Sequence, residues 1–399
     1  MSNKAKTPLV PKLRFPQFKN SDEWSPQDLG DCLDYLQPTE YLVNSTAYND
    51  KHETPVVTAG KTFILGYTNE TEGVFNEPLP VIIFDDFTTA SQFVDFPFKA
   101  KSSAMKILLA KKNANIKFLY ESMQQINYEV GAHGRHWISA YSRIKVAVPE
   151  PSEQQKIADC LSSLDELIAA QARKVAALKT HKKGLMQQLF PREGETQPRL
   201  RFPEFRDAGA WSKRKLSNFL TERSQFPENK VPLYSLTIED GVTPKTERYE
   251  RAFLVNDEAE AYKLVLPNDF AFNPMNLRFG AIGRHSGTEA VAVSKYYNIF
   301  YCDNSVDSRF CDIYFRSDAM VRFYDTMAIG SLIEKRRVHF SDFLKFNIRF
   351  PSSLEQQRIA DCIASLDTLI TATIQELEAL KIHKKGLMQQ LFPQGETLS

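Results

Sequence analysis

The chain has 399 residues, of which 42% are hydrophobic and 25% are charged, and its formal net charge is +1. This length exceeds what one hydrophobic core usually supports, so we expect two globular domains. The near-neutral charge excludes a uniformly polycationic protein but leaves room for a local basic face. No segment has the roughly 18 consecutive apolar residues of a membrane helix, and the N-terminus lacks a secretory signal, so we expect a cytoplasmic protein with no membrane partner.

The first half of the chain begins with a short box, LRFPQF, at residues 13–18. The apolar, β-branched and aromatic runs that follow predict strands and one helix. The predicted strands are 81–87, 93–100, 105–110 and 143–149, and the predicted helix is 116–127. This mixture predicts a mixed α/β (α+β) globular body.

A long helix is predicted to follow this body. Between residues 153 and 191, apolar positions step by threes and fours, which is typical of a coiled-coil seam. Ser152 with Gln155 three residues later fits a capping box, and Pro191 ends the pattern. The seam residues that we expect to pack against another helix or to bind a partner are Leu164, Ile168, Leu178 and Leu185.

The second half repeats this plan. It opens with LRFPEF at residues 200–205, continues with predicted strands at 290–294, 298–303 and 345–351 and a predicted helix at 318–330, and ends in another long helix. Its seam residues are Leu366, Ile370, Leu380 and Leu387.

The two long segments are copies of each other. Residues 153–191 and 355–393 are identical at 27 of 39 positions, and both end in HKKGLMQQLFP. Between Leu33 and Arg135 in the first body, and between Leu220 and Arg337 in the second, the two bodies share no sequence register. We expect the two helices to pack antiparallel against each other inside one molecule. This packing gives the chain approximate two-fold symmetry, with two unlike bodies.

Catalytic and metal-binding motifs are absent from the sequence. The five cysteines form no CxxC pair, and there is no phosphate-binding loop, HExxH or GxSxG motif. Residues 272–280, FNPMNLRFG, partly match the Asn-Pro-Pro-aromatic motif of adenine methyltransferases, but they lack the second proline and the aromatic residue. An Asn-Pro turn between strands explains this segment better, so we expect no catalytic residue and no metal ligand.

Basic and polar clusters remain as candidate sites for reading a polyanion. Arginine can bind guanine with two hydrogen bonds, asparagine can bind adenine, and lysine neutralises phosphate. The candidate DNA-binding residues are Lys61, Lys99, Lys101, His133, Arg135 and His136 in the first body, and Asn276, Arg278, Arg284, His285, Lys335, Arg336 and Arg337 in the second. Arg135 and Arg337 match under the helix repeat, which favours a shared role. A solvated charged surface is the simpler explanation for each of the other clusters.

The tandem EQQKIADC and EQQRIADC helices, the LRFPxF boxes and FNPMNLRFG resemble the specificity subunits of Type I restriction-modification systems. The resemblance covers nearly the whole chain. It implies target recognition domains at residues 1–150 and 194–350, conserved spacer helices at 151–193 and 351–393, and a tail at 394–399.

The resemblance also implies partners. These are double-stranded DNA, two methyltransferase subunits and restriction (motor) subunits, in a prokaryotic cytoplasm. The chain itself would be non-catalytic and would hold no cofactor: S-adenosylmethionine belongs to the methyltransferase, and ATP with Mg²⁺ to the motor subunit. The alternative from the residues alone is a coiled-coil scaffold or adaptor whose bodies bind proteins and not DNA.

Overall fold

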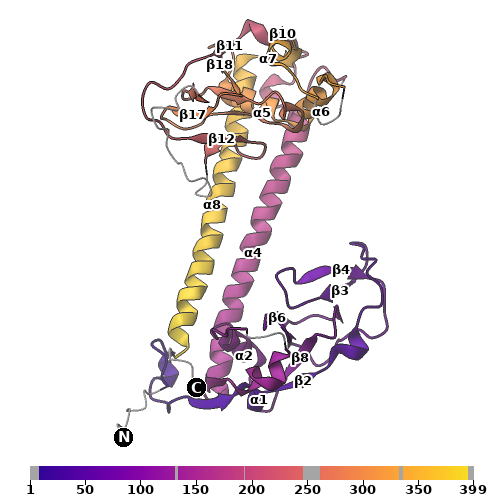
Figure 1. The fold of residues 1–399 in the computed structure, drawn as a ribbon, viewed down its shortest axis with the longest axis vertical. Helices are drawn as coiled ribbons and strands as arrows, with labels where there is room; N and C mark the ends of the chain where they lie inside the picture. The colour runs from indigo at the N-terminus through magenta and orange to yellow at the C-terminus, as the bar shows by residue number, and fades with distance from the viewer. Residues whose placement is uncertain (1–8, 131–133, 193, 246–260, 332–335, 394–399) are drawn as a thin grey trace. The chain divides into compact units, whose positions relative to one another are not determined.

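The computed structural model describes residues 9–130, 134–192, 194–245, 261–331 and 336–393. Over this part of the chain the fold is mixed α/β with two long helices, which confirms the predicted fold class (Figure 1). The chain divides into two compact units. Unit 1 contains the residues up to Ala172 and those from Gln375 onward, and unit 2 contains Arg173–Ile374. Each unit therefore holds one globular body and a part of both long helices.

The body of unit 1 is built on a four-stranded antiparallel sheet in the order β2-β8-β5-β6. A second sheet has the order β4-β3-β7, and β1 pairs with β9. The strands are β1 (Ser25–Asp28), β2 (Leu33–Leu36), β3 (Thr54–Val57), β4 (Ile64–Thr68), β5 (Val81–Asp85), β6 (Ser91–Val94), β7 (Lys99–Ala100), β8 (Met105–Ala110) and β9 (Lys145–Val148). The helices are α1 (Leu29–Cys32), α2 (Ile116–Met123) and α3 (His136–Ser139).

The body of unit 2 is built on a four-stranded sheet in the order β11-β18-β15-β16. Three two-stranded pairs accompany it: β10-β19, β12-β13 and β14-β17. The strands are β10 (Ser212–Lys215), β11 (Leu220–Arg223), β12 (Tyr234–Thr237), β13 (Gly241–Pro244), β14 (Tyr262–Val265), β15 (Phe270–Phe272), β16 (Ile282–Arg284), β17 (Val291–Ser294), β18 (Asn298–Cys302) and β19 (Asn347–Phe350). The helices are α5 (Ser308–Phe315), α6 (Asp318–Met327) and α7 (Phe340–Phe343).

The two four-stranded sheets have the same topology, although their sequences share no register. In each sheet the first strand pairs with the strand that precedes the first longer helix, α2 or α5. The same hydrogen bond closes both pairs: the amide of Lys111 donates to the carbonyl of Cys32, and the amide of Asp303 donates to that of Phe219, both at 2.9 Å. Equivalent positions in the two bodies can therefore be assigned from hydrogen bonds where the sequence gives no alignment.

The long helices are α4 (Pro151–Leu189) and α8 (Ser353–Leu391), and they pack antiparallel. In unit 1, Asp165 of α4 contacts Lys384 of α8. In unit 2, Lys182, later in α4, contacts Asp367, earlier in α8. The capping box predicted at Ser152 is wrong, because Pro151 already occupies the first helical position.

The repeated motifs hold each body to the start of its long helix. Arg14 of the first box forms a two-pronged ion pair with Glu153, with N···O distances of 2.8 and 2.7 Å, and both side chains are almost fully buried. Arg201 and Glu355 form the same pair at 2.8 and 2.7 Å. A planar contact with two hydrogen bonds fixes the relative orientation of the arginine and the glutamate and also neutralises their charges. The ion pair therefore explains both the arginine of the box and the glutamate of EQQ.

The last turn of each long helix completes the core of a body. Phe392, at the end of α8, packs against Trp24 and Phe118 in unit 1, with ring centroids 6.2 and 5.4 Å apart. Phe190, at the end of α4, packs against Trp211 and other aromatic rings in unit 2. Each body therefore takes the apolar residues of one copy of the GLMQQLF segment into its core.

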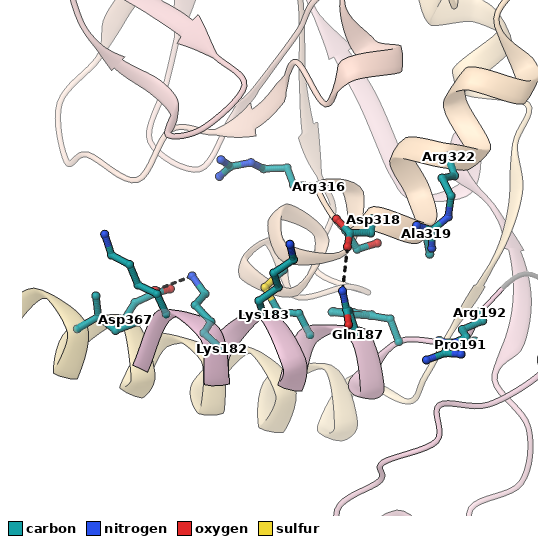
Figure 2. A pocket seen from close by; sticks show the side chains of 15 residues that line it. Lys182, Lys183, Gln187, Pro191, Arg192, Arg316, Asp318, Ala319, Arg322 and Asp367 are labelled. Atoms are coloured by element: carbon teal, nitrogen blue, oxygen red, sulfur yellow. Dashed lines mark hydrogen bonds and ion pairs between the residues drawn. The ribbon is translucent and has the colours of Figure 1, made fainter. Parts of the chain in front are cut away.

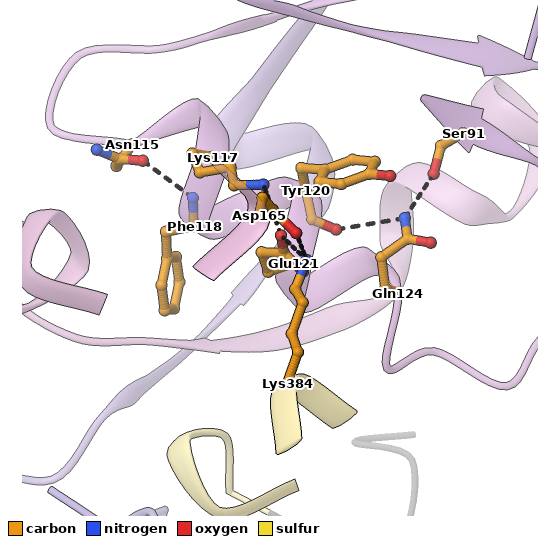
Figure 3. A network of polar contacts seen from close by, with 9 residues as sticks. All are labelled: Ser91, Asn115, Lys117, Phe118, Tyr120, Glu121, Gln124, Asp165 and Lys384. Carbon is orange, nitrogen blue, oxygen red and sulfur yellow. Dashed lines mark hydrogen bonds and ion pairs between the residues drawn. The ribbon is translucent and has the colours of Figure 1, made fainter. Parts of the chain in front are cut away.

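A charged cluster joins α2, α4 and α8 in unit 1 (Figure 3). The Nζ atom of Lys384 lies 2.7 Å from Asp165 and 3.0 Å from the buried Glu121, and Lys117 contacts the same two carboxylates at 2.7 and 2.6 Å. Burial raises the pKa of Asp165, but hydrogen bonds from Lys117 and Lys384 outweigh it, and the pKa lies below its ordinary value. Two ammonium groups thus neutralise two carboxylates, which allows a lysine of α8 to lie at its contact with α2 and α4.

Replacing either helix-end phenylalanine should destabilise one unit. Phe392→Ala should cost unit 1 about 3–5 kcal/mol of unfolding free energy, and Phe190→Ala should cost unit 2 a similar amount, because each leaves a cavity among buried aromatic rings. Amide hydrogen exchange of β5 and β15 in the full-length chain measures the two effects separately. The exposed Lys385→Ala is the matched control, and equal loss of protection in both units with either phenylalanine variant would contradict the assignment.

Candidate nucleic-acid interface

Four of the predicted DNA-contacting side chains are exposed to solvent: Lys61, Arg135, Asn276 and Arg337. Arg135 directly precedes α3, and Arg337 lies three residues before the start of α7, so the two arginines matched by the repeat each lie shortly before a short helix. Both are available for contact with a ligand. His133 and Lys335 lie outside the described residues.

Three predicted residues are buried and are therefore removed as candidates for direct DNA contact. Lys99 is 2% exposed, and it pairs with Glu70 at 3.1 Å. His136 is 7% exposed, and its ring lies 3.1 Å from the hydroxyl of Tyr128. His285 is 2% exposed, with its Nε2 atom 2.8 Å from a backbone carbonyl. These side chains were expected on the surface because their residue types are polar, but each has an internal partner that stabilises it in the core.

The other predicted residues are partly buried and have protein partners. Lys101 lies 5.8 Å above the ring of Tyr48, and a guanidinium nitrogen of Arg284 donates to the side chain of Asn268 at 2.6 Å. Arg278 and Arg336 both pair with the carboxylate of Asp325, at 3.1 and 3.7 Å. These cations support the loops of the bodies.

In unit 1, the loop after β5 is held by hydrogen bonds to its own aspartate and to the start of α3. The Oδ1 atom of Asp85 accepts from the amide of Phe87 at 2.9 Å. The carbonyl of Asp86 accepts from the amide of His136 at 2.8 Å. Arg135 and Phe87 are therefore each one residue away from the same backbone hydrogen bond.

In unit 2, the loop after β15 has the same construction with different residues. The Oδ1 atom of Asn273 accepts from the amide of Met275 at 3.0 Å. The carbonyl of Pro274 accepts from the amide of Val338 at 3.1 Å. Arg337 and Met275 again flank the hydrogen bond. We call this shared arrangement the loop clamp: Asp85, Asp86 and His136 in unit 1, and Asn273, Pro274 and Val338 in unit 2.

A buried ion pair reinforces the loop clamp of unit 1. Lys106 of β8 lies 3.3 Å from the carboxylate of Asp86, and both side chains are 1% exposed. The other oxygen of Asp86 accepts from the amide of Trp137 at 2.8 Å. Asp86 thus fixes two consecutive residues after Arg135: its backbone carbonyl binds His136, and its carboxylate binds Trp137. Sequence analysis missed Asp86, although an Asp directly after a strand is a turn signal, and it placed Asn273 in an Asn-Pro turn without assigning it a role.

A cationic groove of about 590 Å³ lies in unit 2, between the end of α4 and the start of α6 (Figure 2). Lys182 is paired with Asp367 at 2.5 Å, and Gln187 donates to Asp318 at 3.3 Å. Four further cations line the groove and form no ion pair with any described residue: Lys179, Lys183, Arg192 and Arg322. The groove therefore has an excess of positive charge.

The predicted seam residues are all at least half-buried. Leu164 and Ile370 are each 8% exposed, and Ile168, Leu178, Leu185, Leu366, Leu380 and Leu387 are intermediate. This burial favours helix packing over partner binding for these side chains. Among the described residues, no helix is long and apolar enough to span a bilayer, and no group of three or more His, Cys, Asp or Glu side chains is arranged to hold a metal ion.

Comparison with known proteins identifies the family. The sequence profile of the Type I restriction modification DNA specificity domain matches residues 21–180. The chain is 31% identical over 408 residues to the Type I restriction enzyme EcoR124I/EcoR124II specificity subunit of Escherichia coli, covering 94% of this chain and 96% of that protein. The chain belongs to the family of Type I restriction-modification specificity subunits.

Solved structures share the fold. The Type-I restriction-modification system S subunit from M. genitalium superposes with a TM-score of 0.58 at 14% identity, covering 97% of this chain and all of that chain. A chain from structural work on complex assembly and conformational transition of the type I R-M system has a TM-score of 0.51 at 14% identity, covering 92% of this chain and 96% of that chain.

Family membership settles the broad function. The chain is a DNA specificity subunit that acts in a complex with other subunits, and it is not the catalytic subunit of that complex. The resemblance drawn from the repeated motifs is thereby confirmed. The alternative, a coiled-coil adaptor without a role in DNA specificity, is not supported.

Breaking the buried pair of the loop clamp should be costly. Lys106→Met leaves the Asp86 carboxylate buried without a counter-charge and should lower the unfolding free energy of unit 1 by about 3–5 kcal/mol. The double variant Asp86→Asn with Lys106→Met should recover most of the loss, since the amide oxygen of asparagine can still accept from Trp137. Urea unfolding followed by amide exchange of β5 and β8 measures both variants. A double variant no more stable than the single one would contradict the pairing.

Proposed function

We propose that each body of this specificity subunit reads one half of a split DNA target, and that residues 1–150 and 194–350 are the two target recognition domains. The observation that supports this is the loop clamp. The same main-chain construction occurs in both bodies with different side chains, so the two bodies present similar edges of different chemistry. A protein built in this way would read two unlike sequences with one kind of frame.

The long helices would set the separation of the two half-sites and dock two methyltransferase subunits. The repeated HKKGLMQQLFP segment leaves the same residues exposed in both copies, including His181 and Lys183 in α4 and His383 and Lys385 in α8. Two equal surfaces suit two copies of one partner. The cationic groove at the end of α4 would add attraction for an acidic partner surface.

The remaining components would belong to the partners. The methyltransferase subunits would bind S-adenosylmethionine and methylate adenine, and restriction (motor) subunits would use ATP and Mg²⁺. The assembled complex would act on double-stranded DNA in the prokaryotic cytoplasm.

Co-expression with the methyltransferase subunit of the same system tests the proposal. Methylated adenines mapped on the host DNA should fall in a split motif with a fixed gap, and they should be absent when this chain is omitted. Methylation without such a motif, or methylation that does not require this chain, would refute the proposal.

Arg135→Ala and Arg337→Ala should each slow methylation of the mapped target. If the guanidinium contacts a base, each variant should raise the transition-state free energy by about 1–3 kcal/mol. Each loss should be confined to one half-site: base substitutions in that half-site should matter less in the variant than in the wild type. Rates on synthetic duplexes measure this. Lys61→Ala, which removes an exposed lysine of unit 1, should weaken binding uniformly across sequences if it contacts only phosphate.

A further inference from the structure

Phe87 and Met275 occupy the same position in the two bodies, although no sequence alignment relates them. Each is the second residue after the Asp or Asn that caps the loop, and each has its amide held by that side chain, at 2.9 and 3.0 Å. Phe87 directly follows Asp86, whose carbonyl accepts a hydrogen bond from the amide of the residue after Arg135. Met275 directly follows Pro274, whose carbonyl accepts one from the amide of the residue after Arg337. The equivalence therefore rests on hydrogen bonds and not on residue identity.

Both side chains are large, apolar and exposed. Phe87 is 45% exposed and Met275 is 43% exposed. A single exposed apolar residue on a protein surface carries no information. The same exposure at one equivalent position in two bodies of unrelated sequence, on a loop whose main chain is fixed, indicates a shared contact with something outside the unit.

The neighbouring arginine indicates the chemistry of that contact. In each body an exposed arginine flanks the same backbone hydrogen bond as the apolar residue, so the two side chains start from adjacent points. In the major groove of DNA, guanine offers two acceptors that suit arginine, and thymine offers a methyl group that suits an apolar side chain. A rigid loop that carries one residue of each type matches both features.

We propose that Phe87 and Met275 are specificity-determining residues, each of which packs on the methyl group of a thymine in its half-site. This inference rests on the proposed function, because it assumes that the two bodies read DNA. It adds the residue and the base feature that each body uses: Phe87 for one half-site and Met275 for the other.

The test uses the complex of this chain with its methyltransferase subunit and synthetic duplexes that carry the mapped motif. Each thymine of the motif is replaced in turn by deoxyuridine, which removes only the methyl group. For the wild type, one replacement in each half-site should slow methyl transfer about fourfold, the effect of one buried methyl group. Phe87→Ala should slow transfer about tenfold on the unmodified duplex and should no longer respond to deoxyuridine in its own half-site.

Met275→Ala should show the same behaviour in the other half-site, and each variant should keep the wild-type response in the half-site that it does not read. Phe87→Leu, which retains an apolar side chain, should keep most of the activity and the response to deoxyuridine. The matched controls are Leu13→Ala and Leu200→Ala. These leucines occupy equivalent positions in the two boxes, and each is 41% exposed, but they lie outside the loop clamp, so both variants should behave as the wild type does.

The outcomes separate this inference from the proposed function. If the wild-type complex yields no split motif, the proposed function fails. If the motif is found but Phe87→Ala remains as sensitive to deoxyuridine as the wild type, or if no thymine of the motif is sensitive, the inference alone is overturned. A loss of activity in Phe87→Ala that is independent of the thymine methyl group would assign the residue to a protein contact and would also overturn it.

Discussion

The fold depends on one constraint: each globular body has a core that is completed by the far end of a helix from the other half of the chain. Phe392 lies among the aromatic rings of unit 1, and Phe190 lies among those of unit 2. A helix that ends inside a core cannot slide or rotate without opening a cavity there, and cavities lined by aromatic residues are expensive. The antiparallel pairing of α4 and α8 follows, since each helix is held in one unit at its start and in the other at its end.

The repeated motifs divide into inward and outward parts. The inward part includes the buried arginine–glutamate pairs and the two glutamines of EQQ, Gln154 and Gln356, whose side chains donate to the carbonyls of Pro149 and Pro351. The outward part is the polar face near the end of each helix. Packing therefore accounts for the identity of the inward residues in the two copies, and the proposed docking of two copies of one partner would account for the identity of the outward residues.

Much of the scaffold could be predicted from the sequence, because periodic apolar patterns and turn residues act locally. These patterns predicted the two long helices and the strand before each of them. They also predicted the helix at 116–127, which the structure shows as α2. The common topology of the two bodies was not found, because it is carried by main-chain hydrogen bonds, which any residues can form. The buried Lys99 was misjudged for a related reason: its partners, Glu70 and the carbonyl of Glu72, come from another part of the body, and no local pattern points to them.

The loop clamp has an evolutionary consequence. The part of its geometry that both bodies share needs an Asp or Asn as a cap and otherwise uses only main-chain groups, as the contrast between Asp-Asp-Phe and Asn-Pro-Met demonstrates. The side chain of Phe87 or Met275 can therefore change without disturbing the hydrogen bonds of the loop clamp. If Phe87 and Met275 contact bases as proposed, selection can explore new targets through single substitutions at these two positions, while folding and assembly stay under separate and stricter control.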